Sequence, residues 1–331
     1  MNINEIANLA GVSRATVSRY LNNGYVSQDK KEKIQKVIAQ TGYQPSAYAK
    51  TLRTKKTHLI GVIIPKINSD SISRMVAGIS DVLAEAGYQL LLANTNNDEK
   101  EELKYLSVFK QNNIDGIILL GTVITKEHRK AFKELEVPIV ILGQQVDGYS
   151  CVYYDDFNAA RELAEMLLET GKKIGYIGVT QKDEAVGKRR REGFLAALQE
   201  KDALDGNEAY SEAEFDMESG CEKAKELLGK HPELDTIFCA TDTIAIGAMN
   251  CLKEQGKRIP QDVQIAGMGD SRLAMVTTPK LTTVHYFYKS CGMEAAKMLL
   301  SQVQGDRVRK EVKMGYEIVV HDSTRQRKSR D

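Results

Sequence analysis

Long apolar segments are missing from this sequence of 331 residues. A helix needs about 20 consecutive apolar residues to cross a membrane, and no such run occurs, so we expect no transmembrane segment. The start of the chain, Met1 to Glu5, has no charged stretch followed by an apolar one, so we expect no secretory signal. The hydrophobic content of 42% is sufficient for ordinary cores. These absences predict a cytoplasmic protein.

Cysteine and histidine are also scarce, with five residues of each. An odd number of scattered cysteines predicts free buried thiols in a reducing cytosol rather than a disulfide framework. The histidines stand apart from one another and from any zinc-binding spacing, so we predict no metal site. The cysteines are Cys151, Cys221, Cys239, Cys251 and Cys291.

Catalytic and cofactor motifs are lacking as well. Gly267 and Gly269 lack the third glycine and the strand-turn-helix context of a dinucleotide site. Gly187-Lys188 lacks the upstream glycine and the following Ser or Thr of a P-loop. No nucleophile and base stand in a recognisable pattern. We therefore predict a protein that is not an enzyme and needs no cofactor.

Charge is present but unevenly distributed. Residues 1–57 hold ten Lys and Arg against three Asp and Glu, a net of +7, whereas residues 58–331 have a net of −6. A chain of this length is expected to form two or three compact units. The charges therefore predict a small basic head joined to a larger acidic body.

The head, residues 1–44, has the pattern of a helix-turn-helix unit. Apolar residues at helical spacing are followed by Gly11, which can supply the positive φ of a tight turn. Ser13 is a good N-cap for a second helix, Arg14–Leu21, and a third helix is predicted at about 28–41. In such a unit the second helix enters the DNA major groove.

The second helix supplies the candidate base contacts. Arginine can bridge guanine O6 and N7, alanine can contact a thymine methyl group, and hydroxyl groups can contact phosphates. A plainer alternative is a solvated three-helix domain whose arginines only aid solubility. The predicted DNA contacts in the head are Ser13, Arg14, Ala15, Thr16, Ser18 and Arg19.

The segment Pro45–Arg53 joins the head to the body. It contains good helix formers but is shorter than the ~12–15 residues that make isolated helices even marginal in water. We predict that it becomes helical on DNA, with Lys50 and Arg53 near the backbone. Leu52 could then act as an apolar wedge between base steps of the minor groove.

Several strings of the head and the joining segment resemble the headpiece of the LacI/GalR family of bacterial transcription repressors. They are Asn4-Glu5-Ile6-Ala7, Ala10-Gly11-Val12-Ser13, Thr16-Val17-Ser18-Arg19, Leu21-Asn22, Gly42-Tyr43-Gln44-Pro45-Ser46 and Ala49-Lys50-Thr51-Leu52. The resemblance implies a hinge helix at 45–57, with Leu52 as its intercalating leucine. It also implies a homodimer on a near-palindromic, double-stranded operator, in the bacterial cytoplasm and associated with the nucleoid.

In the body, apolar runs typical of buried strands alternate with helical patterns of 10–15 residues. This alternation predicts an α/β fold of doubly wound parallel sheets, with enough units for two of them. The predicted strands are 59–65, 88–93, 115–120, 138–142, 173–179, 235–240 and 263–267, and a helix at 289–304 completes the first sheet. The body also resembles the family's two-lobed periplasmic-binding-protein-like core, with an N-lobe of about 58–156 plus 289–320 and a C-lobe of about 157–288 plus 321–331.

Ligands of open α/β sheets bind outside the carboxyl ends of the strands, which here would face a cleft between the lobes. Polar residues follow several predicted strands at this edge. They are Lys66, Asn68, Ser69, Ser71, Gln144, Thr241 and Asp242. Thr241 and Asp242 could instead only cap the next helix. Amides and hydroxyls suit a carbohydrate, which offers many hydroxyl groups.

The family resemblance adds three further candidates. Arg190 stands at the family's R-x-x-G-[FW] arginine, which implies donation to effector hydroxyls, although three adjacent basic residues can also be merely solvated. Tyr288 stands where relatives place an aromatic ring against the sugar, or it only packs. Many relatives carry an aspartate where Gly269 stands, and Asp270 could substitute for it.

The predicted function is a sequence-specific repressor of a carbohydrate-utilisation operon, released by a sugar or sugar phosphate. The strings 154–156, 187–190 and 240–243 resemble the branch that senses disaccharides such as trehalose or sucrose, free or 6-phosphorylated. Lys66 with Arg190 could hold a phosphate. Two alternatives stay open: an effector or phosphoprotein acting as co-repressor, and a sugar-binding protein without a regulatory role.

The polar, basic tail from His321 to Asp331 predicts a disordered end without a tetramerisation helix.

Overall fold

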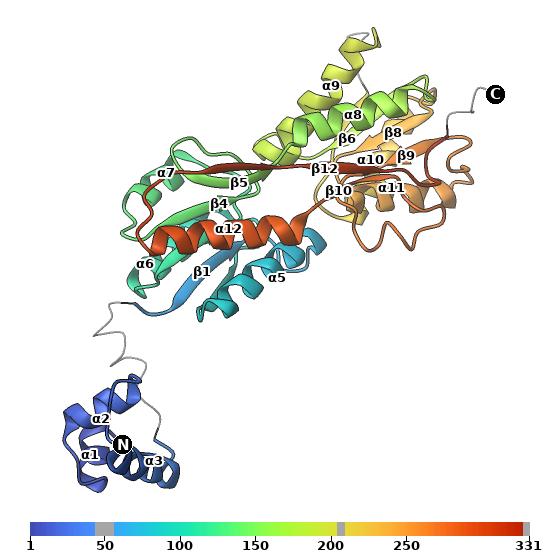
Figure 1. Ribbon diagram of the computed structural model, residues 1–331. Coiled ribbons are helices and arrows are strands. Elements are labelled where there is room, and N and C mark those ends of the chain that lie inside the picture. The colour runs from blue at the N-terminus through green and yellow to red at the C-terminus, as the bar shows by residue number, and fades with distance from the viewer. Residues whose placement is uncertain (44–55, 204–208, 327–331) are drawn as a thin grey trace. The chain divides into compact units, whose positions relative to one another are not determined.

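The computed structural model describes residues 1–43, 56–203 and 209–326. The chain divides into two compact units, Met1–Thr57 and His58–Asp331 (Figure 1). Residues 45–55 of the predicted hinge and linker, among them Lys50, Leu52 and Arg53, lie outside the described residues. None of the helices in the described ranges is long and apolar enough to cross a membrane.

The first unit contains α1 (Ile3–Leu9), α2 (Arg14–Leu21) and α3 (Gln28–Thr41). Ile6, Val17 and Ile34, one from each helix, are fully buried and form the centre of its small core. As predicted, Gly11 has a positive φ of 64° in the turn between α1 and α2. The first two helices with this turn form the predicted helix-turn-helix.

The second unit contains two parallel sheets, and the larger one has six strands. Its strand order is β11-β5-β4-β3-β1-β2. The strands are β1 (Leu59–Ile64), β2 (Gln89–Asn94), β3 (Gly116–Leu119), β4 (Ile139–Leu142), β5 (Ser150–Tyr154) and β11 (Glu311–Met314). The apolar run of β1 alternates between two helical layers. Ile60 and Val62 belong to the core shared with α5 (Asp70–Glu85) and α12 (Tyr288–Val303), whereas Ile63 belongs to the core of α6 (Glu99–Gln111) and α7 (Lys126–Lys133).

The smaller parallel sheet has four strands in the order β7-β6-β8-β9. Its strands are β6 (Ile174–Gly178), β7 (Tyr210–Glu212), β8 (Thr236–Cys239) and β9 (Gln264–Ala266). One face packs on α8 (Asp156–Leu168) and α9 (Arg190–Glu200), the latter preceded by the π-helical segment η1 (Glu184–Arg189). The opposite face packs on α10 (Met217–Lys230) and α11 (Asp242–Glu254).

The two sheets are joined by several passages of the chain (Figure 1). The chain passes from one to the other where β5 leads to α8, where β10 (Thr283–Tyr286) leads to α12, and where β11 leads to β12 (Tyr316–Val319). Strands β10 and β12 pair with each other in antiparallel orientation. The return passage predicted between Asp270 and Tyr288 therefore includes a strand of its own.

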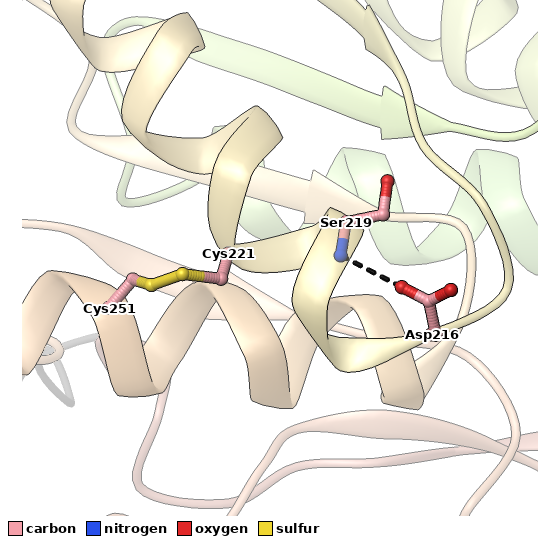
Figure 2. The surroundings of a disulfide bond; sticks show 4 residues. All are labelled: Asp216, Ser219, Cys221 and Cys251. Atoms are coloured by element: carbon pink, nitrogen blue, oxygen red, sulfur yellow. Dashed lines mark hydrogen bonds between the residues drawn. A yellow bond between two sulfur atoms is a disulfide. The ribbon is translucent and has the colours of Figure 1, made fainter.

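The prediction of five free thiols is wrong for two of them. Cys221 on α10 and Cys251 on α11 form a disulfide with a Cα–Cα distance of 5.3 Å (Figure 2). Their separation of 30 residues gives no hint of this, because it is the packing of α10 against α11 that brings them together. Cys151, Cys239 and Cys291 are free and buried.

The prediction of a disordered end is wrong for its first part. Ser323 is fully buried, and Arg325 donates to Asp235 Oδ2, Thr170 O and Pro260 O, each at 3.1 Å. Polar and basic residues are ordered here because they satisfy backbone carbonyls and a carboxylate at one end of the four-stranded sheet. Residues 327–331 lie outside the described part of the chain.

Candidate functional site

Helix α2 presents the predicted DNA contacts on its surface. Arg14, Ala15 and Arg19 are exposed, whereas Val17 is fully buried and fixes the opposite face. Ser13 caps the helix by accepting a hydrogen bond from the Thr16 amide at 3.2 Å. Its hydroxyl also lies 2.9 Å from that of Thr16. The capped end, the half-buried Ser18 and the exposed Arg14 and Arg19 form one polar face, the arrangement that the predicted major-groove contact requires.

Helix α3 adds positive charge to this unit. Lys30, Lys31, Lys33 and Lys36 are all exposed, and among them Lys33 pairs with Asp29 at 2.9 Å. Exposed ion pairs of this kind contribute little to stability. The charge is available to attract phosphates in a sequence-independent way.

The second unit contains a cavity of about 530 Å³ between its two sheets. Its walls are the segments that follow β1, β3, β4 and β5 on one side and β6, β7, β8 and β9 on the other. All of these are carboxyl ends of strands, the edge at which parallel sheets bind ligands. The volume lies within the 300–1,000 Å³ typical of ligand pockets.

A buried ion pair forms part of the wall. Arg190 donates through Nε to Asp156 Oδ1 at 2.7 Å and through Nη1 to Ala240 O at 2.6 Å. Tyr286 donates its hydroxyl to the same Asp156 oxygen at 3.1 Å, and its ring lies 5.2 Å from the guanidinium. Arg190 and Asp156 are 5% and 3% exposed, so neither charge is merely solvated. The ion pair joins Asp156, just after β5, to Arg190, the first residue after η1. The hydrogen bond from Arg190 to Ala240 O extends this contact to the residue after β8.

Two further buried carboxyl groups line the cavity. Burial raises the pKa of Asp183 to about 6, although it accepts a hydrogen bond from the Val186 amide at 2.9 Å. Burial likewise raises the pKa of Asp242 to about 6, against hydrogen bonds from the Ser271 amide at 2.6 Å and the Thr283 hydroxyl at 2.5 Å. Both groups cap or begin helices, yet both also face the cavity. Perturbed carboxyl groups in a pocket are typical of functional sites.

Eight of the ten predicted effector residues lie in the cavity wall. They are Lys66, Asn68, Ser69, Ser71, Arg190, Thr241, Asp242 and Tyr288. Thr241 also caps α11 by accepting from the Ile244 amide at 3.3 Å, so its capping and lining roles coexist. The ring of Tyr288 lies 5.3 Å from the Arg74 guanidinium, which fixes its position at the wall.

The structure does not bring Gln144 or Asp270 into the wall. Gln144 is buried and donates through Nε2 to Gly121 O at 2.5 Å, so it supports the loop after β3. Asp270 Oδ2 lies 2.6 Å from His285 Nδ1 and the residue has a φ of 45°, whereas its neighbours Gly269 and Ser271 line the cavity.

Asp156 and Asp183 are wall residues that we did not predict. Each is an acidic residue after a buried strand, at the start of the following helical segment. That position is a usable signal, but it does not separate a capping carboxylate from one that faces a ligand. The partnership of Asp156 with Arg190 joins residues 34 positions apart and is visible only in the fold.

A DNA-binding head followed by a two-lobed core with a ligand-sized cleft defines a ligand-responsive transcription regulator. Comparison with known families agrees with this class. The model of the periplasmic binding proteins and sugar binding domain of the LacI family matches residues 57–321, and that of the bacterial regulatory proteins of the lacI family matches residues 2–46. The chain belongs to the LacI family of bacterial regulatory proteins.

Individual relatives extend over almost the whole chain. The sucrose operon repressor of Staphylococcus xylosus is 34% identical over 92% of this chain and 94% of its own length. The ribose operon repressor of Halalkalibacterium halodurans is 33% identical over 91% of this chain and 90% of its own. Among solved structures, a transcriptional regulator CelR-cellobiose complex is 26% identical, with a TM-score of 0.75, covering 98% of this chain and 99% of that one.

Proposed function

We propose that this protein represses a carbohydrate-utilisation operon in the bacterial cytoplasm and is released from its operator by a sugar. The observation that carries the proposal is the cleft, whose polar groups converge at the carboxyl ends of both sheets. It occurs in the same chain as a capped helix with exposed Arg14 and Arg19. The names of the sucrose and ribose operon repressors support the same function.

A disaccharide is the favoured effector. One of the relatives is a sucrose operon repressor and one of the similar structures holds cellobiose, although another relative carries the name of ribose. The cleft offers apolar wall residues such as Leu142, Met268 and Tyr288 beside its polar groups. That combination suits a sugar, which has an apolar ring face and a polar rim.

DNA recognition is assigned to α2 in the major groove, with Arg14, Ala15 and Arg19 reaching the bases and Ser13 and Thr16 contacting phosphates. Leu52, Lys50 and Arg53 keep their proposed roles in the hinge and in the minor groove. A helix-turn-helix unit of this kind binds as a dimer to two half-sites, which fits a near-palindromic operator.

A homodimer is supported by one edge of the six-stranded sheet. Strand β2 is the last in the strand order, and its Leu91 and Leu92 are 42% and 36% exposed. An unpaired edge strand with exposed apolar side chains is a surface that proteins usually cover. A second copy of the chain would cover it in a two-fold arrangement.

The experiment uses the full-length protein together with DNA fragments that this protein has selected from a random library. Fluorescence anisotropy should show sequence-selective binding, and a panel of mono- and disaccharides, first screened by thermal shift, should contain a member that releases the DNA. The variant Arg14→Ala with Arg19→Ala should lose DNA binding and keep the thermal shift with sugar. Binding that is tightened by every active sugar would favour the co-repressor alternative. Sugar binding without selective DNA binding would favour the alternative without a regulatory role and refute the proposal.

A further inference from the structure

We propose that the effector is an uncharged sugar held mainly through carboxylate acceptors, and that the cleft discriminates against phosphorylated sugars. This inference rests on the proposed function, because it specifies the ligand of the same cleft. It closes an alternative that the sequence leaves open, in which Lys66 and Arg190 hold a phosphate.

The charges of the cavity wall oppose an anion. Among the described residues that line it, six side chains are acidic and three are basic. A phosphate dianion would therefore enter a region of net negative charge and be repelled there. The acidic residues are Asp70, Asp156, Asp183, Asp216, Glu218 and Asp242, and the basic ones are Lys66, Arg190 and Arg272.

The basic groups already have partners. Arg190 gives its Nε to Asp156 and its Nη1 to Ala240 O. Arg272 Nε lies 3.5 Å from Asp70 Oδ1, and Lys66 Nζ lies 3.5 Å from the backbone oxygen of Phe215. A guanidinium fork can bind a phosphate through two parallel hydrogen bonds, but freeing that of Arg190 would break the buried Arg190–Asp156 pair and leave a carboxylate without its cation.

Three helical segments that begin at the cavity wall, η1, α10 and α5, carry an acid at or near their N-terminus. A helix N-terminus favours a bound anion, but here Asp183 accepts from the Val186 amide of η1 and Asp216 accepts from the Ser219 amide of α10 at 2.8 Å (Figure 2). Helix α5 has Asp70 in its first turn. At η1 and α10 the protein's own carboxylates thus occupy the amide groups that a phosphate could otherwise bind.

The same carboxylates suit a neutral sugar. An ionised carboxylate accepts up to about four hydrogen bonds and donates none, so it matches sugar hydroxyls and repels phosphate oxygens. Asp242 receives one bond from the Ser271 amide and one from the Thr283 hydroxyl, which leaves acceptor positions for a ligand. Asp183 follows β6 of the same sheet, is buried and lines the cavity, and it can accept hydrogen bonds in the same way.

The test compares each disaccharide with its own 6-phosphate: sucrose, trehalose and cellobiose are titrated in both forms into the complex of full-length protein and operator. For the active sugar, the neutral form should release the DNA at a concentration at least about tenfold lower, equivalent to one unfavourable interaction of ~1.4 kcal/mol. Release by the phosphorylated form at the lower concentration would overturn this inference and leave the proposed function intact. Failure of every form, together with failure of every sugar in the mono- and disaccharide panel, would refute both if operator binding is intact.

Charge variants test the cause. Asp183→Asn keeps an acceptor for the Val186 amide and removes one negative charge, so the ratio of phosphorylated to neutral potency should rise. Asp262→Asn, which removes an acid outside the cavity wall, is the matched control and should leave the ratio unchanged. Lys66→Met should weaken both forms alike. A selective loss of the phosphorylated form in Lys66→Met, or an unchanged ratio in Asp183→Asn, contradicts the proposal.

Discussion

Replacing the buried Asp183 by asparagine should stabilise the free protein at neutral pH. Burial raises the pKa of this carboxyl group from 3.8 to about 6, against the amide hydrogen bond and the nearby Arg190 charge. The folded state therefore binds the proton more tightly than the unfolded state. The ionised group reduces stability, and this reduction grows as pH rises from the unfolded to the folded pKa and is complete above about pH 6.

The size of the effect follows from the pKa difference. A shift of about 2 pKa units corresponds to about 3 kcal/mol at about pH 7.5, and the same two values leave about 1 kcal/mol at about pH 4.5. Asparagine keeps the acceptor for the Val186 amide and carries no charge at either pH. The advantage of Asp183→Asn over the natural protein should thus increase by about 2 kcal/mol between these conditions.

Urea unfolding of both proteins, followed by circular dichroism across this pH range, measures the difference directly. Asp262→Asn is an informative control, because the hydrogen bonds from Arg258 lower the pKa of Asp262 and its pH trend should run in the opposite direction. A difference for Asp183→Asn that is independent of pH, or that is largest in acid, would refute the reasoning. A confirmed increase would mean that the cleft retains a carboxylate that lowers its stability, as expected for a binding residue.

Three other predictions follow from the described contacts and the proposed hinge. Arg190→Ala leaves the Asp156 carboxylate buried without its cation and should lower the unfolding free energy by about 3–5 kcal/mol in urea unfolding; the double variant with Asp156→Ala should recover part of that loss, and no recovery would contradict the pairing. Replacing Cys221 and Cys251 by alanine should lower the unfolding free energy by about 2–4 kcal/mol relative to the oxidised protein, and equal stability of the two under oxidising conditions would contradict the disulfide. Leu52→Ala should weaken operator binding in anisotropy titrations while the thermal shift with sugar is unchanged; an unaltered operator affinity would sink the wedge role.

Local patterns account for most of the regular structure. The continuous apolar run at 59–65 predicts a strand buried on both faces. Strand β1 occupies residues 59–64 of it, and its side chains meet two helical layers. Among the strands that were not predicted, β7, β11 and β12 have three or four residues each and are partly exposed. Their pairing joins residues as distant as Cys151 and Glu311, so no local periodicity marks them.

The candidate site was also predictable only in part. Strand ends could be located in the sequence, and the polar residues that follow β1 and β8 do line the cleft. The direction of each side chain could not be derived, which is why Gln144 and Asp270 were expected there and Asp156 and Asp183 were not. Arg190 shows the limit most clearly: its position could be assigned by resemblance, but its ion pair depends on β5 and η1 meeting in space.

The passages of the chain between the two sheets determine the order in which the parts of the fold can be completed during synthesis. The six-stranded sheet receives α12 on one face and β11 at one edge only after the whole four-stranded sheet has been translated. A nascent chain that has reached Tyr154 has five strands of that sheet, but the apolar side chains that α12 later covers remain without their cover. The three helices of the first unit bury their own core and can fold as they emerge. A chain interrupted before α12 would thus carry a finished DNA-binding head on an unfinished core.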